Sequence, residues 1–221
     1  MPRAPQRLTR KPATPAPRRT RPVPKPEAMP FDRRQQILVE AARLFAAKGF
    51  EATSVRDIAN ATGILAGSLY YHFASKEELF VAVHAAGMEI LIRTAQDAIR
   101  DVRDPWDRLA AAAAAHCTAL LESSDFMLLV VPNFPKSIGQ YRDELIRQRD
   151  EYEAIISQVV AGLDLPPTID PRLFRLHFIG ALNWTQSWFR PASGLTPAEI
   201  GRQLVAMLRP PTIPGSESPS S

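Results

Sequence analysis

The residues from Thr53 to Lys76 have the types and the spacing needed to hold a phosphate backbone. Hydroxyl groups recur along this segment at Ser54, Ser68 and Tyr71, and the segment ends in a lysine. Hydroxyls, a lysine and the free N–H groups of helix starts are the groups that donate hydrogen bonds to phosphate oxygens. The segment therefore predicts contact with a nucleic acid.

Two short helices joined by a turn are expected to position these groups. Ser54 begins the first helix with Asp57 three residues on, which is the capping-box spacing, and Gly63 provides the turn. Apolar residues are spaced to form a small core with a preceding helix: Val55, Ile58, Ala59, Ile64, Leu69 and Phe73. The pattern is that of a helix-turn-helix, whose second helix presents its exposed side chains to the major groove of DNA.

Catalysis and metal binding find little support in the sequence. The histidines are too widely spaced for a metal pair on one helix, which needs a spacing of three or four; they are His72, His84, His116 and His177. Cys117 is the single cysteine, which excludes an internal disulfide and a cysteine zinc site. Neither a Gly-x-Ser-x-Gly elbow nor a phosphate-cradling glycine loop is present. We therefore expect no enzyme, no metal and no cofactor.

The elements that must hold this motif read as helix between residues 31 and 209, because apolar residues recur at three and four. A first helix ends at Gly49, and Ser75, with Glu78 three residues on, starts a long helix to about Arg100. Proline at the first helical position marks three later starts. The later helices are expected over 105–121, 137–162, 171–190 and 197–208, with a short helix and a loop at 125–135. The predicted fold class is all-α with about nine helices.

Composition is that of a globular protein with two unusual ends. The chain has 221 residues, of which 45% are hydrophobic. Residues 1–30 hold nine prolines and eight basic residues against one acid, whereas the remaining residues hold 19 basic and 22 acidic ones. We expect residues 1–30 to form a disordered tail. The tail could be a basic arm that attracts DNA, a solubilising extension, or a stretch that precedes the true start of translation at Met29. Residues 210–221, rich in proline and serine, are expected to be a second disordered tail.

Segments that would direct the chain to a membrane are missing from the sequence. No apolar run approaches the roughly 20 residues that span a bilayer, and residues 1–30 contain no apolar segment of the secretory kind. A single cysteine is consistent with a reducing compartment. We expect a cytoplasmic protein with no membrane partner.

Residues 33–80 resemble the DNA-binding domain of the TetR family. The resemblance rests on a dense and ordered set of residues: Phe45, Gly49-Phe50, Thr53, Ile58-Ala59, Gly63, Ser68-Leu69-Tyr70-Tyr71-His72-Phe73 and Ser75-Lys76-Glu77-Glu78-Leu79. It implies a DNA-binding domain over 31–80 and an effector-binding and dimerisation domain over 81–209. It also implies a ligand-responsive transcriptional regulator, expected to be a repressor, that binds double-stranded operator DNA as a homodimer.

The resemblance assigns DNA contacts within the motif. The implied phosphate contacts are Thr53 or Ser54, Tyr71 and Lys76, and the residues implied to lie near bases or backbone are Arg56, Ser68 and His72. Tyr70 is expected to pack inward with Leu69, because aromatic rings at such spacing are commonly core. The predicted recognition helix opens with Leu65-Ala66-Gly67, of which Ala66 and Gly67 are expected to contact DNA, although the segment offers no side-chain donor to a base edge. Specificity is then expected to rest on Arg56, on contact between Ala66 and a thymine methyl group, and on DNA shape.

The C-terminal half resembles the effector domain of TetR regulators of fatty-acid and steroid catabolism, several of which sense acyl-CoA thioesters. The matching segments are Gly180-Ala181-Leu182-Asn183-Trp184-Thr185-Gln186-Ser187-Trp188-Phe189-Arg190-Pro191 and Leu195-Thr196-Pro197-Ala198-Glu199-Ile200. The resemblance implies a small-molecule effector, with an acyl-CoA as the leading candidate. It also implies that the last two helices pair with their symmetry mates.

Four residues are candidates for effector binding: Arg147, Tyr152, Trp184 and Trp188. Arg147, Arg149 and Tyr152 lie on the helix that borders the ligand cavity in the family, where an arginine could meet an anionic ligand; a solvated helix face is the alternative. Trp184 and Trp188 lie one turn apart and share a helix face. They fit a pocket wall and they fit core or dimer packing.

Two other functions are consistent with the sequence. A hydrophobic drug-like effector needs only the aromatic residues, and the chain would then regulate efflux or detoxification genes. A helical ligand-binding protein without DNA binding is the other, and the intact segment between residues 53 and 76 opposes it. The sequence leaves open the operator, the regulated genes and the choice between repressor and activator.

Overall fold

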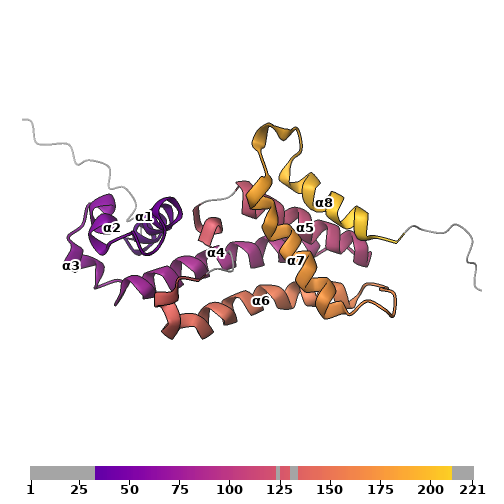
Figure 1. The fold of residues 1–221 in the computed structure, drawn as a ribbon, viewed down its shortest axis with the longest axis horizontal. Coiled ribbons are helices and arrows are strands. Elements are labelled where there is room, and N and C mark those ends of the chain that lie inside the picture. Colours follow the sequence, from indigo (N-terminus) through magenta and orange to yellow (C-terminus); the bar gives the residue numbers. More distant parts are fainter. Residues whose placement is uncertain (1–32, 123–124, 130–133, 211–221) are drawn as a thin grey trace, which may run out of the picture. The chain divides into compact units, whose positions relative to one another are not determined.

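The computed structural model describes residues 33–122, 125–129 and 134–210, and the described helices belong to one compact unit, Asp32–Ser221. The α-helices in this part of the chain are α1 (Arg33–Lys48), α2 (Val55–Thr62), α3 (Ala66–Leu69), α4 (Lys76–Ile99), α5 (Pro105–Glu122), α6 (Arg142–Ala161), α7 (Pro171–Trp188) and α8 (Pro197–Leu208) (Figure 1). The 3₁₀ helices are η1 (Asp125–Leu129), η2 (Lys136–Tyr141) and η3 (Pro191–Ser193). The predicted all-α fold is confirmed, with eight described α-helices where about nine were expected.

Side-chain caps explain where the helices begin. The Ser54 side chain accepts from the backbone N–H of Asp57, and the Asp57 carboxylate accepts from the backbone N–H of Ser54. Thr196 starts α8 with the same reciprocal arrangement, and Ser75 and Asp170 cap α4 and α7. Each cap satisfies N–H groups that the first helical turn leaves without partners. The predicted starts at these four positions are therefore correct.

The N-terminal helices α1 to α3 pack around one small core beside the start of α4 (Figure 1). The rings of Phe45, Phe50 and Phe80 meet with centroids 5.2–5.7 Å apart, so aromatic packing joins α1 to α4. Gly63 follows α2 at φ 66°, a left-handed conformation that glycine adopts cheaply. This turn sets the direction in which α3 leaves the core.

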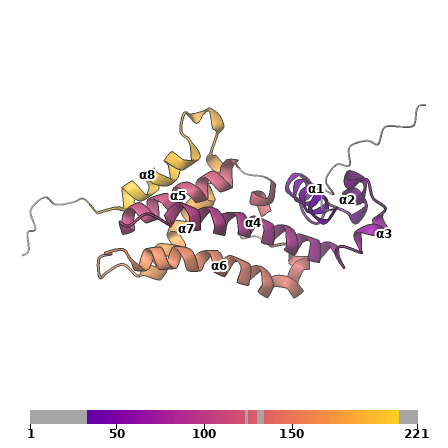
Figure 2. The ribbon, with the colours of Figure 1, turned by 180° about the vertical axis from the view of Figure 1, so that it is seen from behind.

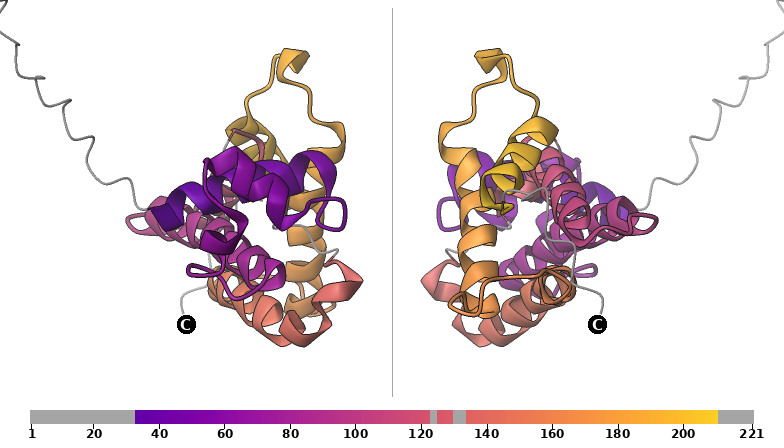
Figure 3. Two further views of the ribbon diagram at one scale, coloured as in Figure 1. Left: turned by 90° about the vertical axis from the view of Figure 1, so that its left-hand side faces the viewer. Right: turned by 90° about the vertical axis from the view of Figure 1, so that its right-hand side faces the viewer.

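Helices α4 to α8 build the rest of the described unit. Helix α4 runs between α5 and α6, as the front and back views agree (Figures 1 and 2). Helix α8 lies along α5, and the two backbones approach so closely that a Cβ added at Gly201 would lie 2.4 Å from the Ala113 carbonyl oxygen. Helix α7 contacts both α5 and α6 and connects through η3 to α8 (Figure 3). Residues of α4, α5, α6 and α7 meet around one interior space.

Some boundaries differ from the prediction. The helix expected from residue 137 begins as η2 and becomes α-helical only at Arg142; Gly139, a poor helix former, lies in the 3₁₀ stretch. Helix α7 ends at Trp188 rather than Arg190, because Pro191 disfavours helical conformation just before it. The predicted domain boundary after residue 80 falls inside α4, and the two predicted disordered tails lie outside the described residues apart from Pro210. None of the described helices is long and apolar enough to cross a membrane.

Candidate DNA-binding surface and effector cavity

The helix-turn-helix presents an exposed, mostly polar surface. Tyr71 is 91% exposed in the turn after α3, and Ser54, Arg56 and Gly67 are also exposed. Ala66, Ser68 and His72 are partly exposed on the same motif. These predicted DNA-contact residues are therefore free to meet a partner.

Thr53 is not part of this surface, and the prediction that its side chain touches a phosphate is wrong. It is 1% exposed, and its hydroxyl lies 2.8 Å from the Gly49 carbonyl oxygen and 3.3 Å from that of Leu44. Gly49 directly follows α1 and Leu44 lies near its C-terminal end, so the hydroxyl is bonded to the end of this helix. Thr53 thus closes α1, and Ser54 is the residue of the pair that can face DNA.

Lys76 has a structural role that the sequence did not reveal. Its Nζ donates to the backbone carbonyls of Phe50 at 2.9 Å and Thr53 at 3.0 Å, and it lies 4.2 Å from the centroid of the Phe50 ring. A cation over an aromatic face is attracted by the ring quadrupole. The ammonium therefore fastens the start of α4 to the turn before α2, and a phosphate contact would have to compete with these partners.

Tyr70 was expected in the core and lies outside it. Its side chain is 54% exposed, and that of Leu65 is 79% exposed, whereas Leu69 between them is fully buried. Because α3 is a single turn, the inward direction is filled by Leu69 alone. Tyr70 and Leu65 are additional surface residues of the motif, and Leu65 can offer apolar contact to a base methyl group.

A cavity of about 170 Å³ lies between α4, α5, α6 and α7. Its wall is mostly apolar and carries a few polar side chains: His84, Met88, Leu91, His116, Phe134, Arg149, Tyr152, Glu153, Leu176, Ile179, Gly180 and Asn183. An apolar chamber with a few convergent polar groups is the usual form of a small-molecule site. Tyr152, an effector candidate from the sequence, is on this wall. His84, His116 and Asn183 were not predicted there, because only the packing of four helices brings them together.

Two buried hydrogen bonds organise the polar part of the wall. Nδ1 of His116 lies 2.7 Å from the Tyr152 hydroxyl, and Nδ1 of His84 lies 2.7 Å from Oε1 of Gln148. Burial lowers the pKa of His116 to about 4, against the opposing effect of Asn183, and lowers the pKa of His84 as well. Both rings are therefore neutral at neutral pH.

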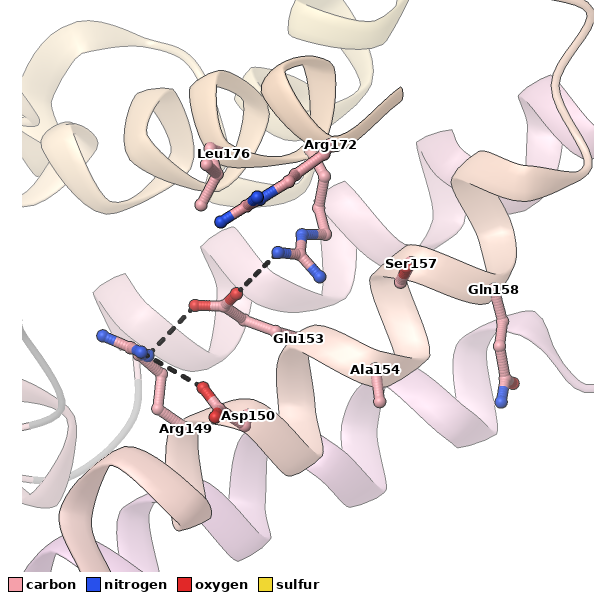
Figure 4. Close-up of a pocket in the computed structure, with 9 residues that line it drawn as sticks. Arg149, Asp150, Glu153, Ala154, Ser157, Gln158, Arg172 and Leu176 are labelled. Atoms are coloured by element: carbon pink, nitrogen blue, oxygen red, sulfur yellow. Dashed lines mark hydrogen bonds and ion pairs between the residues drawn. The ribbon is translucent and has the colours of Figure 1, made fainter. Parts of the chain in front are cut away.

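A larger groove of about 730 Å³ adjoins the cavity between α6 and α7. The two share Arg149, Glu153 and Leu176. Arg172 of α7 and Arg149 of α6 reach into the groove (Figure 4), and Arg175 of α7 also lines it. The apolar cavity thus adjoins a groove in which three guanidinium groups converge.

Glu153 holds two of these arginines. Its carboxylate lies 3.1 Å from Nε of Arg149 and 3.2 Å from a terminal nitrogen of Arg175, and its side chain is only 14% exposed (Figure 4). The ion pair to Arg175 joins α6 to α7. A ligand anion that enters the groove would meet arginines already paired with an internal carboxylate.

Arg147 lines neither the cavity nor the groove, and its assignment to effector binding stays a prediction. It is exposed and paired with Glu144 and Glu151 along α6, and these partners raise its pKa. Residues two apart on a helix face in different directions. Arg149 therefore lines the cavity while Arg147 faces away from it.

Trp184 and Trp188 line neither the apolar cavity nor the arginine-lined groove, and their assignment to a pocket wall stays a prediction. They are 69% and 48% exposed, and they continue an exposed stripe on α7 with Leu173, His177 and Ala181. Asn183, one residue earlier, turns to the cavity instead. Packing against a second copy, the alternative that the sequence left open, fits these exposed rings.

Within the described residues, no group of three or more His, Cys, Asp and Glu side chains could hold a metal ion. Cys117 is fully buried, and burial raises the pKa of its thiol to about 11. A thiol with such a pKa is protonated at neutral pH and is a poor nucleophile.

Two protein-family profiles match this chain. The profile of bacterial regulatory proteins of the tetR family matches residues 37–83, and the profile of the tetracyclin repressor-like C-terminal domain matches residues 102–210. The first covers the helix-turn-helix and the start of α4, and the second covers the helices from α5 to α8.

Individual proteins agree with the profiles. The HTH-type transcriptional repressor KstR2 of Mycobacterium tuberculosis is 30% identical over 182 residues, which are 80% of this chain and 90% of that protein. The HTH-type transcriptional activator FasR of Mycolicibacterium smegmatis is 32% identical over 102 residues, 46% of this chain and 47% of that one. The structure of apo AibR superposes with a TM-score of 0.69 at 26% identity, over 81% of this chain and 99% of AibR. A second AibR structure, in complex with isovaleryl coenzyme A and operator DNA, gives a TM-score of 0.69 at 24% identity, over 80% and 97%.

Proposed function

The chain belongs to the tetR family of bacterial regulatory proteins and is a DNA-binding transcriptional regulator, and we propose that it is a repressor released from its operator by a thioester of coenzyme A. The observation that carries the choice of effector is the shared wall between the apolar cavity and the arginine-lined groove. A protein that acts on operator DNA works in the cytoplasm, and we place this one there.

The two adjoining spaces match the two chemical halves of such a thioester. An acyl group is apolar and suits the inner cavity of about 170 Å³. The coenzyme carries phosphates, which planar guanidinium groups bind with paired hydrogen bonds, and the groove supplies Arg149, Arg172 and Arg175. AibR, a protein of the same fold, has been solved with isovaleryl coenzyme A and operator DNA together. A hydrophobic drug-like effector would fill the cavity without using the arginines of the groove.

Repression is supported by the relatives that cover most of the chain, since KstR2 is a repressor. A dimer on a promoter blocks the polymerase by occupying its site. FasR, which matches less than half of this chain, is an activator and supports the alternative sign of regulation.

Helix α4 can carry the signal from the cavity to the DNA. Its first turn is fastened to the helix-turn-helix through Lys76, and its later residues His84, Met88 and Leu91 line the cavity. A ligand shifts the equilibrium only if it binds the DNA-released state more tightly than the DNA-bound one. A ligand that displaces α4 from α6 would change the separation of the two recognition helices in the homodimer and so release the operator.

We further propose that Ser54, Arg56, Ala66, Gly67, Ser68, Tyr71 and His72 form the DNA contact, with Tyr71 at a phosphate. Replacing Tyr71 with Phe removes one hydroxyl from a ring that is 91% exposed, so the fold should be unaffected. Operator affinity should fall several-fold, to a similar degree for specific and nonspecific DNA, because phosphate contacts carry no sequence information. Unchanged affinity at every salt concentration in a mobility-shift titration would refute the contact.

Operator release tests the effector. Complexes of the full-length protein with DNA from its own promoter are titrated with isovaleryl coenzyme A and larger acyl thioesters, with the matching free acids, and with hydrophobic cations. Release by a thioester at concentrations where its free acid has no effect is expected. Release by acids or cations, with no response to any thioester, would replace the proposal by the hydrophobic-compound alternative.

A further inference from the structure

Leu65 is an apolar side chain that the fold leaves in solvent. It is 79% exposed directly before α3, whereas its neighbour Ile64 is partly buried against the core. A single exposed leucine is common on protein surfaces, so its position has to show whether it has a role. Packing within the described part of the chain does not account for this side chain.

The backbone position of Leu65 is one that seldom holds leucine. Leu65 is the N-cap of α3, and its hydrocarbon side chain cannot accept a hydrogen bond from the helix. Ser54, Ser75, Asp170 and Thr196 cap four other helices with side-chain oxygens. Leucine is among the residues least favoured at an N-cap. Local stability would favour a serine or an aspartate at position 65 too, so the leucine points to a contact outside the chain.

The two residues after Leu65 leave the front of α3 nearly bare. Ala66 carries one methyl group and Gly67 none. The φ of Gly67 is not positive, and a Cβ built on it would meet nothing within 4 Å among the described residues. Glycine inside a helix is disfavoured relative to alanine. The fold therefore does not require a glycine here, and the open space in front of it lets a partner approach the backbone.

The place of α3 indicates which partner this is. Helix α3 lies at the opposite end of the described unit from α8 in both views (Figures 1 and 2), so Leu65 is remote from the exposed residues of α8. The first residues of a recognition helix meet base edges in the major groove. Thymine displays a methyl group there, and an apolar side chain distinguishes it from the other bases. A thymine methyl group is therefore the partner whose chemistry matches Leu65.

We propose that Leu65 is a specificity-determining residue that packs on the C5 methyl group of one thymine in each operator half-site, and that Gly67 lets α3 approach the bases closely enough for this contact. The inference rests on the proposed DNA contact and adds a residue and the base that it recognises. It moves the methyl contact expected for Ala66 to the residue before it, because the side chain of Leu65 is longer and more exposed.

Deoxyuridine scanning tests the contact, because deoxyuridine pairs with adenine as thymidine does and lacks only the C5 methyl group. The probe is the segment of the protein's own promoter that the full-length dimer protects in a footprint, with each thymine replaced in turn. We expect replacement of one thymine in each half-site to weaken binding about fourfold, the effect of one buried methyl group. A tightly bound operator that is insensitive to every replacement overturns the inference and leaves the proposed function standing. A promoter without a protected segment counts against the proposed function itself.

The variant Leu65→Ala assigns the contact to Leu65. It should bind the thymine and deoxyuridine operators equally, whereas the parent keeps the fourfold difference. A merely structural role would weaken binding to both operators alike and preserve the difference. Val39→Ala, which shortens an exposed apolar side chain of α1, is the matched control and should preserve it as well. A difference that survives Leu65→Ala overturns the assignment.

The variant Gly67→Ala tests the close approach. The added methyl group meets no described atom and improves helix propensity, so the midpoint of thermal unfolding should be unchanged or higher. Operator affinity should fall about tenfold, comparable to one mismatched base pair, because the methyl group holds the helix away from the bases. Unreduced stability together with weaker DNA binding is a result that a purely structural glycine would not give. Operator affinity equal to that of the parent overturns the close approach on which the contact of Leu65 depends.

Discussion

Thr53 and Tyr71 carry hydroxyl groups in the same motif, and their surroundings give them different roles. The Thr53 hydroxyl is sealed against carbonyls near the end of α1, whereas the Tyr71 ring is exposed. The same holds for the charged residue of the motif, because the ammonium of Lys76 donates to two backbone carbonyls and lies over an aromatic ring. Residue type indicated phosphate binding for all three, and only the fold separates the residue that is free for DNA from those already engaged.

Glu153 is predicted to lower the affinity of the protein for its effector, because its carboxylate competes with ligand phosphates for Arg149 and Arg175. Replacing it with Gln keeps the shape and removes the charge. Affinity for isovaleryl coenzyme A, measured by calorimetry, should rise about two- to fivefold, in keeping with the strength of partly exposed ion pairs. Glu151→Gln, on the exposed face of α6, is the matched control and should leave affinity unchanged. Weaker binding by Glu153→Gln would show that the carboxylate positions the arginines rather than competing for them.

His116 should make the folded state sensitive to acid. Its pKa is about 4 in the folded protein against an ordinary 6.5, so the unfolded chain takes up the proton first as pH falls. The stabilisation is complete above pH 6.5 and is lost between about 6.5 and 4, at up to about 1.4 kcal/mol per pH unit for this one proton. Urea unfolding at pH 7.5 and 5 measures the difference, which should be smaller in His116→Asn. An equal loss in parent and variant would mean that the ring does not remain neutral in the fold.

At the scale of the helix, the first residues of the helices were predicted from the sequence more accurately than the residues that line the cavity. The starts at Ser54, Ser75, Asp170 and Thr196 depend on side chains that cap N–H groups two or three residues away, so they can be read locally. The choice between Arg147 and Arg149, or between Asn183 and Trp184, depends on which face of α6 or α7 meets its neighbours. That packing involves residues far apart in the sequence, and helical periodicity alone does not specify it.

The contact between α5 and α8 depends on Gly201. A methyl group at this position would lie 2.4 Å from the Ala113 carbonyl oxygen, and a backbone atom cannot move aside as a flexible side chain does. Gly201→Ala should therefore destabilise the protein by about 1–3 kcal/mol despite the better helix propensity of alanine. The midpoint of thermal unfolding should fall by several degrees. Gln203→Ala, at an exposed position of α8, is the control and should change it little. A Gly201→Ala variant as stable as the parent would show that the helices can separate at no cost.

At the scale of the whole molecule, the proposed coupling between effector binding and DNA binding runs through α4 and through the dimer. Ser137, at the start of η2, donates to Glu51 at 2.6 Å, so the segment leading into α6 is also tied to the turn after α1. The N-terminal core is thus connected to both helices that bound the cavity on this side. A change in the distance between α4 and α6 is therefore expected to move the recognition helix.

The homodimer should form through the exposed stripe of α7 together with α8. On α7 this stripe contains Leu173, Trp184 and Trp188, and α8 adds Met207 and Leu208, all between 40% and 75% exposed in the single chain. Contiguous exposed apolar residues of this size mark a protein interface. Trp184→Glu places a charge in the stripe without touching the core, so the variant should keep its helical content and sediment as a monomer. Two linked recognition helices bind two half-sites with an effective concentration that a monomer lacks, so operator affinity should fall about 10²-fold or more.

Gln96→Glu adds the same charge on an exposed position of α4 and should remain dimeric. Sedimentation velocity decides the matter: a Trp184→Glu protein that is still dimeric at low micromolar concentration would move the interface to another face.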